Sequence, residues 1–325
     1  MTSRERVRRA VLFERPDRIP RALPEPYGSD IQGVGLGPDP DFVPSMKTPR
    51  KWENEWGCLW EKTDDDRTMG RIYDHPLASY DRLESFRFPD FLKPERYRRF
   101  DNPGEKFVLA TIPVSLMQTV EDLRGPEAAW TDPYVNPVEL ERLLDRLTDM
   151  ALGVIDRFAD LGADGIFLYD DWGHQDRLML SPDMFRAFWK PRYTRIFRCA
   201  RERKLLTFMH SCGYIVDILD DLIEVGLNVI QMDQQENMGL ANLGKRFGGR
   251  LCFWCPVDIQ VIMVPGSVAE IRAYARRLIN TLGRFDGGFI AKWYPAPDAV
   301  GHTREKLDAM CEEFVVYGQK VTFPL

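Results

Sequence analysis

His210 and Cys212 are the two side chains in this sequence best suited to hold a metal ion together. Side chains alternate along an extended chain, so residues two apart point to the same side. A neutral imidazole and a thiolate directed at one point are typical zinc ligands. The alternative is a structural role, with Cys212 buried and His210 bonded to a backbone carbonyl, because free cysteine is a common core residue.

The segments around this pair predict that it lies at the end of a buried strand. Residues 205–209 form a short apolar run of strand length, and apolar residues recur at helical spacing after Gly213. Strand and helix alternate in this way through more than half of the chain. Strands are expected at residues 19–23, 107–112, 165–169, 205–209, 229–232, 251–254 and 288–291, and the longest helices at 137–161, 268–282 and 303–317.

Such alternation predicts a parallel sheet, and we expect a (β/α)8 TIM barrel. Seven barrel strands can be counted, and the eighth is expected before residue 104. Residues 25–50 are rich in glycine and proline and predict a long loop, while residues 52–71 predict a β-hairpin. No linker divides the chain, so residues 1–325 are predicted to form a single domain with an N-terminal extension. No glycine-rich nucleotide-binding motif is present.

Charge and composition argue against several classes of function. The net charge of −6 argues against general nucleic-acid binding. No apolar run reaches the roughly 18 residues of a membrane span, and the basic start of the chain lacks the apolar core of a secretory signal. We therefore expect a cytoplasmic protein whose six cysteines are thiols, metal ligands or core residues.

Polar side chains follow most of the predicted strands, and catalytic groups of (β/α)8 barrels gather at the C-terminal strand ends. Asp170 and Asp171 are candidate acid–base residues, one facing the barrel mouth and the other bonding loop amides. The alternative for both is capping of the following segment. Lys292 is a candidate catalytic group that would hold an anion. The candidate substrate-binding residues are Gln231, Asp258 and Trp293.

A catalytic zinc site needs a third protein ligand besides His210 and Cys212, because such sites use three protein ligands and one open position. Cys255, at the end of a later strand, is the best third ligand, with Asp233 and Glu236 as oxygen alternatives. Cys255 could instead be a small core residue, which is the commoner fate of cysteine.

Several motifs occur together in this chain. They are Arg4-Glu5-Arg6-Val7 with Pro16-Asp17-Arg18-Ile19-Pro20, Asp170-Asp171-Trp172-Gly173 with Leu180-Ser181-Pro182, His210-Ser211-Cys212-Gly213, and Val257-Asp258-Ile259-Gln260. With them the chain resembles the uroporphyrinogen decarboxylase superfamily over most of its length, and within it the cobalamin-dependent methyltransferases. The RQAGR-type stretch with which the decarboxylase itself holds a tetrapyrrole is absent.

The resemblance implies a (β/α)8 barrel, in agreement with the alternation of strands and helices. It also implies zinc held by a His-x-Cys pair and a later cysteine in a Gly-Cys turn, and cobalamin carried by a partner corrinoid protein. His210 and Cys212 match the pair. The later position reads Ala291-Lys292-Trp293 and has no cysteine, so Cys255 is the substitute.

The leading hypothesis is a zinc-dependent methyltransferase of corrinoid metabolism. Zinc would act as a Lewis acid on the ether oxygen of a methoxylated substrate or, in the opposite direction, would hold a thiol acceptor as thiolate. Trp172, Trp254 and Trp293 lie near strand ends and favour an aromatic methyl ether, which is the substrate of an O-demethylase component.

Two alternatives belong to other classes of protein. The first is a metal-free lyase that decarboxylates a small carboxylic acid, with Asp170 or Asp171 as the acid and Lys292 as the anion holder. The second is a non-catalytic protein that binds a corrinoid or an organic acid. Metal content would separate the first alternative from the methyltransferase, and binding without turnover would indicate the second.

Overall fold

Eight strands form the central sheet in the order β1-β11-β10-β9-β8-β7-β6-β2, and all neighbours in this order are parallel. The computed structural model describes residues 1–62, 70–102 and 105–320. The edge strands meet where Asp30 N donates to Arg21 O at 2.7 Å. This nearly closed ring confirms the predicted (β/α)8 barrel. Its strands are β1 Arg21–Ala22, β2 Ile31–Val34, β6 Phe107–Thr111, β7 Gly165–Tyr169, β8 Leu206–His210, β9 Val229–Gln231, β10 Cys252–Cys255 and β11 Phe289–Lys292.

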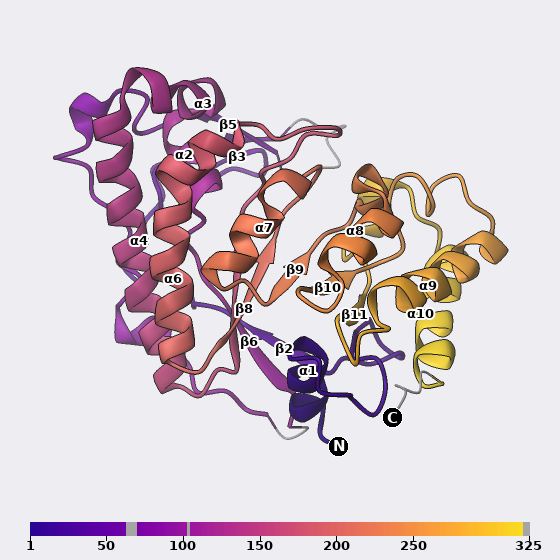
Figure 1. The fold of residues 1–325 in the computed structure, drawn as a ribbon. Coiled ribbons are helices and arrows are strands. Elements are labelled where there is room, and N and C mark those ends of the chain that lie inside the picture. The colour runs from indigo at the N-terminus through magenta and orange to yellow at the C-terminus, as the bar shows by residue number, and fades with distance from the viewer. Residues whose placement is uncertain (63–69, 103–104, 321–325) are drawn as a thin grey trace.

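Helices lie outside the sheet, with α4 and α6 on one side of the strands and α9 and α10 on the other (Figure 1). The predicted bounds of α9 are confirmed, and those of α4 and α10 agree within one residue, because long amphipathic repeats give a clear signal. The helices are α2 Leu116–Arg124, α3 Pro126–Val135, α4 Pro137–Asp160, α5 Pro182–Met184, α6 Lys190–Glu202, α7 Val216–Val225, α8 Leu240–Phe247, α9 Val268–Leu282 and α10 Arg304–Gly318. Shorter turns are η1 Tyr80–Arg82, η2 Pro94–Arg96, η3 Phe185–Trp189, η4 Gln235–Met238 and η5 Pro297–Val300.

The barrel interior takes alternate side chains of each strand. The inner cluster includes Phe107, Leu109, Phe167, Leu206, Phe208, Val229, Cys252, Trp254 and Ile290. The side chains between them, Cys255 among these, pack outward in the larger cluster that contains the helices. The same alternation gives the inward-facing residues at the C-terminal strand ends, which form the mouth of the barrel. They are Thr111, Tyr169, His210, Gln231 and Lys292.

Helix α1, Ser3–Val11, closes the N-terminal end of the barrel (Figure 1). Val7 and Val11 belong to the inner cluster, and Gly288 N donates to Ala10 O at 2.7 Å. The helix therefore covers the end of the barrel opposite to the C-terminal strand ends.

Asp30 ties this helix to the edge strands. The carboxylate is 1% exposed and accepts hydrogen bonds from Ser3 Oγ at 2.7 Å, Arg6 Nη1 at 2.8 Å and Arg18 Nη1 at 2.8 Å. It also accepts from Arg21 N, in β1, at 2.9 Å. One buried carboxylate therefore holds the plug, β1 and β2 together.

The eighth barrel strand, β2, lies within residues 25–50, where the sequence predicts a loop. Ile31 and Val34 pair with Phe107 and Ala110 of β6. Only Ile31 of the four residues is buried, and Gly33 provides no side chain to mark a face. The hydrophobic pattern on which strand prediction depends is therefore missing from a strand that backbone pairing still incorporates.

A small antiparallel sheet accompanies the barrel. Strands β3 Lys51–Glu53, β4 Leu59–Glu61 and β5 Arg71–Asp74 pair in sequence order, and Trp52 stacks on Trp60 with ring centroids 5.9 Å apart. The hairpin predicted for residues 52–71 is confirmed for β3 and β4, and its residues 63–69 lie outside the described part of the chain. Within residues 1–62, 70–102 and 105–320, no helix is both long and apolar enough to cross a membrane.

Candidate metal centre

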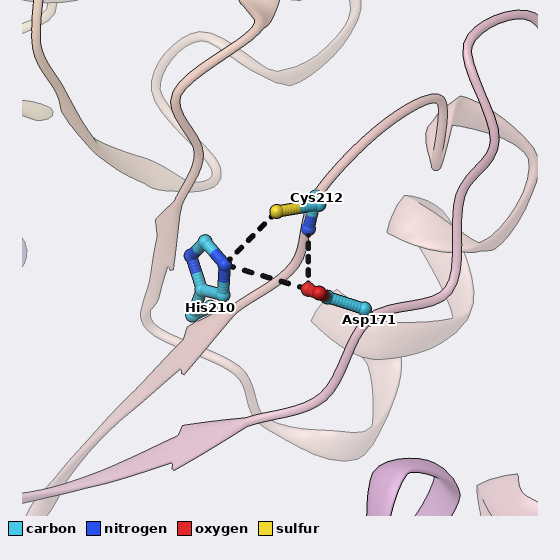
Figure 2. A group of neighbouring side chains, drawn as sticks. All are labelled: Asp171, His210 and Cys212. Atoms are coloured by element: carbon cyan, nitrogen blue, oxygen red, sulfur yellow. Dashed lines mark hydrogen bonds and ion pairs between the residues drawn. The ribbon is translucent and has the colours of Figure 1, made fainter. Parts of the chain in front are cut away.

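Three side chains from the ends of two neighbouring strands converge at the barrel mouth (Figure 2). His210 ends β8, Cys212 follows two residues later, and Asp171 lies in the loop after β7. His210 Nε2 is 3.3 Å from Cys212 Sγ and 3.4 Å from Asp171 Oδ1. All three ligand atoms lie within 4.8 Å of one another, and no other group of His, Cys, Asp and Glu side chains among the described residues is arranged in this way.

These separations suit a zinc ion. Zinc lies about 2.0–2.3 Å from nitrogen, oxygen and sulfur ligands, so two ligands of a tetrahedral site are roughly 3.3–3.5 Å apart. Both distances measured from His210 Nε2 agree with this spacing. One imidazole, one thiolate and one carboxylate would leave the fourth position open, as in catalytic zinc sites.

A tight contact between two loops brings Asp171 beside Cys212. Gly173 lies two residues after Asp171, Gly213 directly follows Cys212, and a Cβ at Gly213 would lie 2.2 Å from the carbonyl oxygen of Gly173. Gly213 also has a φ of +70°, which glycine adopts without strain. In the contact, Cys212 N donates to Asp171 Oδ1 at 2.8 Å. The glycines therefore set the geometry of the three-residue group.

Electrostatics at the mouth favour a cation. Burial raises the pKa of the Cys212 thiol above its usual range, and the negative charges of Asp171 and Asp233 raise this pKa further. A bound cation reverses this effect, since it stabilises the thiolate and the nearby carboxylates together.

Asp170 faces away from the mouth, opposite to its neighbour Asp171. Its carboxylate is 1% exposed and accepts hydrogen bonds from Met117 N at 3.0 Å and Gln118 N at 2.8 Å, both in the first turn of α2. Tyr193 Oη donates to the same carboxylate. Burial raises the pKa of Asp170 to about 7. The structure thus shows one aspartate at the mouth and the other bonded to backbone amides.

A chain of hydrogen bonds runs from Lys292 to His210 across the mouth. Lys292 Nζ donates to Asp233 Oδ1 at 3.0 Å, and Gln231 Nε2 donates to the same oxygen at 2.8 Å. Gln231 Oε1 in turn bonds His210 Nδ1. Gln231 therefore contacts the candidate zinc ligand His210 directly, and Lys292 is connected to His210 through Asp233 and Gln231.

Comparison with known proteins places the chain in a family. Residues 105–293, more than half of the chain, match the sequence model of uroporphyrinogen decarboxylase (URO-D). The chain belongs to the uroporphyrinogen decarboxylase family. Relatives within this family include both methyltransferases and decarboxylases.

Two curated relatives illustrate this division of the uroporphyrinogen decarboxylase family. The chain is 28% identical to the methylcobamide:CoM methyltransferase MtaA of Methanosarcina barkeri over 137 residues, which are 42% of this chain and 38% of that protein. It is 28% identical to the uroporphyrinogen decarboxylase of Xanthomonas axonopodis pv. citri (strain 306) over 158 residues, 47% of this chain and 42% of that protein. The chain spans about two fifths of the length of these relatives.

A solved structure shares the fold of this chain over nearly the full length of both proteins. It is a methyltransferase from Methanosarcina mazei, with a TM-score of 0.68 and 17% sequence identity. The match covers 97% of this chain and 98% of that chain. This similarity agrees with the barrel described above and shows the fold alone.

Cys255 lies apart from the group formed by Asp171, His210 and Cys212. It follows the inward-facing Trp254 on β10, so its side chain points outward into the cluster between sheet and helices, and it is fully buried. Asp171 completes the group instead. The oxygen alternatives also have other partners: Asp233 binds Lys292, and Glu236 accepts from Tyr274 Oη at 2.8 Å.

Asp258 and Trp293 contact other parts of the protein around the mouth. The Asp258 carboxylate accepts hydrogen bonds from three backbone amides, those of Glu236, Gln260 and Val261, each at 3.0 Å. Trp293 packs against the outer cluster. Both are expected from the sequence to bind substrate, and that role stays a prediction.

Two tyrosines lie where tryptophans were expected to form an aromatic site. Trp172 is fully buried and Trp254 lies inside the barrel. The Tyr169 ring is 46% exposed with its centroid 5.7 Å from that of His210, and Lys292 Nζ lies 5.6 Å from the Tyr294 ring centroid. Tyr169 is not among the site residues predicted from the sequence, although it stands two residues after Phe167 in the same alternation.

Proposed function

We propose that this chain is a zinc-dependent methyltransferase of corrinoid metabolism. It would move a methyl group from a methoxylated aromatic compound to cobalamin on a separate corrinoid protein. The observation that carries this proposal is the convergence of Asp171, His210 and Cys212 at the open end of the barrel. Similarity to a methylcobamide:CoM methyltransferase supports methyl-transfer chemistry.

In this proposal, His210 Nε2, Cys212 Sγ and Asp171 Oδ1 hold the metal. Bound zinc supplies Lewis acidity toward the ether oxygen of the substrate. Asp171 replaces Cys255 as the third ligand because its carboxylate already lies beside the pair. Asp170 is a positioning residue, since its carboxylate holds the first turn of α2.

The tyrosines at the mouth suit an aromatic substrate. Tyr169 presents half of its ring beside His210, so a second ring can stack there. Burial and the charge of Asp233 raise the pKa values of Tyr169 and Tyr294. Both hydroxyls therefore stay protonated near neutral pH and can donate hydrogen bonds to substrate oxygen.

The proposed reaction balances without a further oxidant or reductant. The bond between ether oxygen and methyl carbon breaks as a bond between that carbon and cobalt forms. Cob(I)alamin, as the methyl acceptor, would supply the electron pair for the new bond, with methylcobalamin as the product. The leaving phenolate takes one proton from solvent.

The test is methyl transfer from a panel of methoxylated aromatics to free cob(I)alamin, followed by the absorbance of methylcobalamin. We expect product formation by the zinc-loaded protein, loss of activity after chelation, and recovery on adding zinc. Cys212→Ser should lose activity, while Cys199→Ser, at a cysteine on the surface-side helix α6, is the matched control. Activity that is unchanged by complete zinc removal would contradict the proposal.

The same preparation separates the two alternatives. A metal-free lyase would release carbon dioxide from a panel of small carboxylic acids at a rate independent of zinc. A binding protein would retain cob(II)alamin or an organic acid in equilibrium dialysis without turnover. Similarity to uroporphyrinogen decarboxylases keeps the first of these as the second candidate function.

A further inference from the structure

The chain of hydrogen bonds behind His210 has a fixed polarity. A lysine ammonium only donates, and a carboxylate only accepts. Asp233 Oδ1 accepts from Lys292 Nζ at 3.0 Å, so the Gln231 group that contacts this same oxygen must also be a donor. This requirement orients the Gln231 amide with Nε2 toward Asp233, because the flipped amide would place two oxygens against each other.

The orientation of Gln231 then decides the state of His210. With Nε2 toward Asp233, Gln231 presents Oε1 to His210 Nδ1, and an amide oxygen can only accept. The proton of the neutral imidazole must therefore sit on Nδ1. His210 Nε2, which faces Cys212 Sγ and Asp171 Oδ1, is left with its lone pair.

We infer that Gln231, Asp233 and Lys292 are positioning residues that hold His210 as the Nδ1–H tautomer and so present Nε2 to a metal. The consequence for the metal rests on the proposed zinc function, whereas the tautomer does not. Three electron-pair donors, Nε2, Sγ and Oδ1, then face one point, which is the arrangement that a cation stabilises. Partners of this kind orient metal-binding histidines in general.

Burial keeps water from replacing the hydrogen bonds that connect Lys292 to His210. Gln231 is 2% exposed and Asp233 is 5% exposed, and the Lys292 side chain is 12% exposed. A buried carboxylate needs a counter-charge, which Lys292 provides. Lys292 stands where the resemblance leads one to expect a later cysteine. In this protein, Lys292 orients the candidate ligand His210 through Asp233 and Gln231 and is not itself a ligand.

The first experiment reads the tautomer directly in the metal-free protein. Two-bond 1H–15N NMR at a pH where imidazoles are neutral distinguishes Nδ1–H from Nε2–H, and the chain has only four histidines to assign. We expect His210 to be protonated at Nδ1 in the wild type. Asp233→Asn should keep this state because its amide oxygen can still accept from Lys292 and Gln231, whereas Gln231→Met should give a mixture of tautomers. Unchanged signals from the other three histidines control for the fold.

The second experiment measures zinc affinity by competition with a chromogenic chelator. Gln231→Met should weaken binding by about 10- to 100-fold, the usual cost of losing such a partner. Asp233→Asn, which keeps an oxygen between the two donors, is expected to resemble wild type. Asp233→Leu removes the oxygen and should resemble Gln231→Met.

The two experiments separate this inference from the proposed function. An Nε2–H tautomer in the wild-type protein, or an Nδ1–H tautomer that survives in both Gln231→Met and Asp233→Leu, overturns the inference even if zinc binds. An Nδ1–H tautomer that depends on Gln231 supports it even in a protein that fails to transfer methyl groups.

Discussion

Asp170 and Asp171 are adjacent and chemically identical, yet their carboxylates face different parts of the molecule. Asp171 lies 3.4 Å from His210 Nε2, while Asp170 bonds the backbone of α2. Alternation along an extended chain predicts such a division, but it does not say which aspartate faces inward. The answer comes from the loop contact at Gly173 and Gly213, which requires the three-dimensional structure.

The third candidate zinc ligand is also difficult to predict from the sequence. Strands of a parallel barrel are buried on both faces, so their sequences lack the polar alternation that would mark the inner side. Cys252 faces inward and Cys255 outward, although both are fully buried apolar positions of β10. The spacing in the sequence therefore predicts that His210 and Cys212 face one point, but it does not show which of the remaining cysteines and carboxylates lies beside them.

Replacing Asp171 tests the revised ligand set. We expect Asp171→Asn to lower zinc affinity by more than about 100-fold, because the loss of a supporting residue alone costs about 10- to 100-fold. The amide oxygen can still accept from Cys212 N, so the loop should stay in place. Cys255→Ala, the control, should keep zinc affinity while losing about 1 kcal/mol of stability from the smaller buried side chain. The reverse ranking in chelator competition would restore Cys255 as the ligand.

Glu121 in α2 gives a prediction about pH. It is 8% exposed, accepts a hydrogen bond from Trp130 Nε1 at 2.6 Å, and has its pKa raised to about 7, mainly by burial. Between the unfolded pKa near 4.5 and the folded value, the folded state binds more protons, so the stability of the wild type falls as pH rises. Glu121→Gln should therefore be more stable than wild type at pH 8, by roughly 1–3 kcal/mol.

The advantage of Glu121→Gln should nearly disappear by pH 4.5, where Glu121 is protonated in the folded state and half protonated in the unfolded state of the wild type. Chemical denaturation at the two pH values measures both free energies of unfolding. Equal stability of wild type and variant at pH 8 would show that Glu121 carries no penalty for ionisation.

At the scale of elements, the barrel could be predicted because most of its strands and helices carry strong patterns. Residues 268–282 were predicted as a helix with the bounds that α9 has, and the strands from β6 to β11 lie within a residue or two of their predicted positions. Strand β2 was missed because it has one buried residue and a glycine in its centre. Its place is fixed by pairing with β6, a long-range contact that no local pattern records.

The loop contact beside the metal group gives a prediction at this scale. Gly213→Ala places a Cβ 2.2 Å from the Gly173 carbonyl at a φ of +70°, so we expect a loss of 3 kcal/mol or more, on the order of severe core changes, and loss of zinc binding. Gly162→Ala is the matched control, because Gly162 has a φ of +87° with nothing within 4 Å of the added Cβ. It should cost about 1 kcal/mol from backbone strain alone and keep zinc. Similar melting curves for the two variants would argue against the contact.

At the scale of the whole molecule, Asp30 connects the N-terminal plug to both edges of the sheet. Asp30→Asn leaves Arg6 and Arg18 without their buried counter-charge, and we expect a loss on the order of 3 kcal/mol. Asp17→Asn removes another partner of Arg6, but Asp17 is 39% exposed, so the loss should stay below about 1 kcal/mol. Urea denaturation of both variants compares the two losses, and a larger loss for Asp17→Asn would contradict the role of Asp30.

The position of Asp30 also has a consequence for the order in which the chain folds. Strand β1 pairs with β11, so Arg21 must wait for Ala291 to be synthesised before it gains its neighbour. Until then, the buried cluster around Asp30 has only part of the surface on which it packs, so residues 3–34 reach their final contacts later than the segments that pair with their neighbours along the chain. A chaperone that shields apolar segments during synthesis would therefore act on residues 3–34 for longer than on the segment from β6 to β8, whose strands pair with the next ones along the chain.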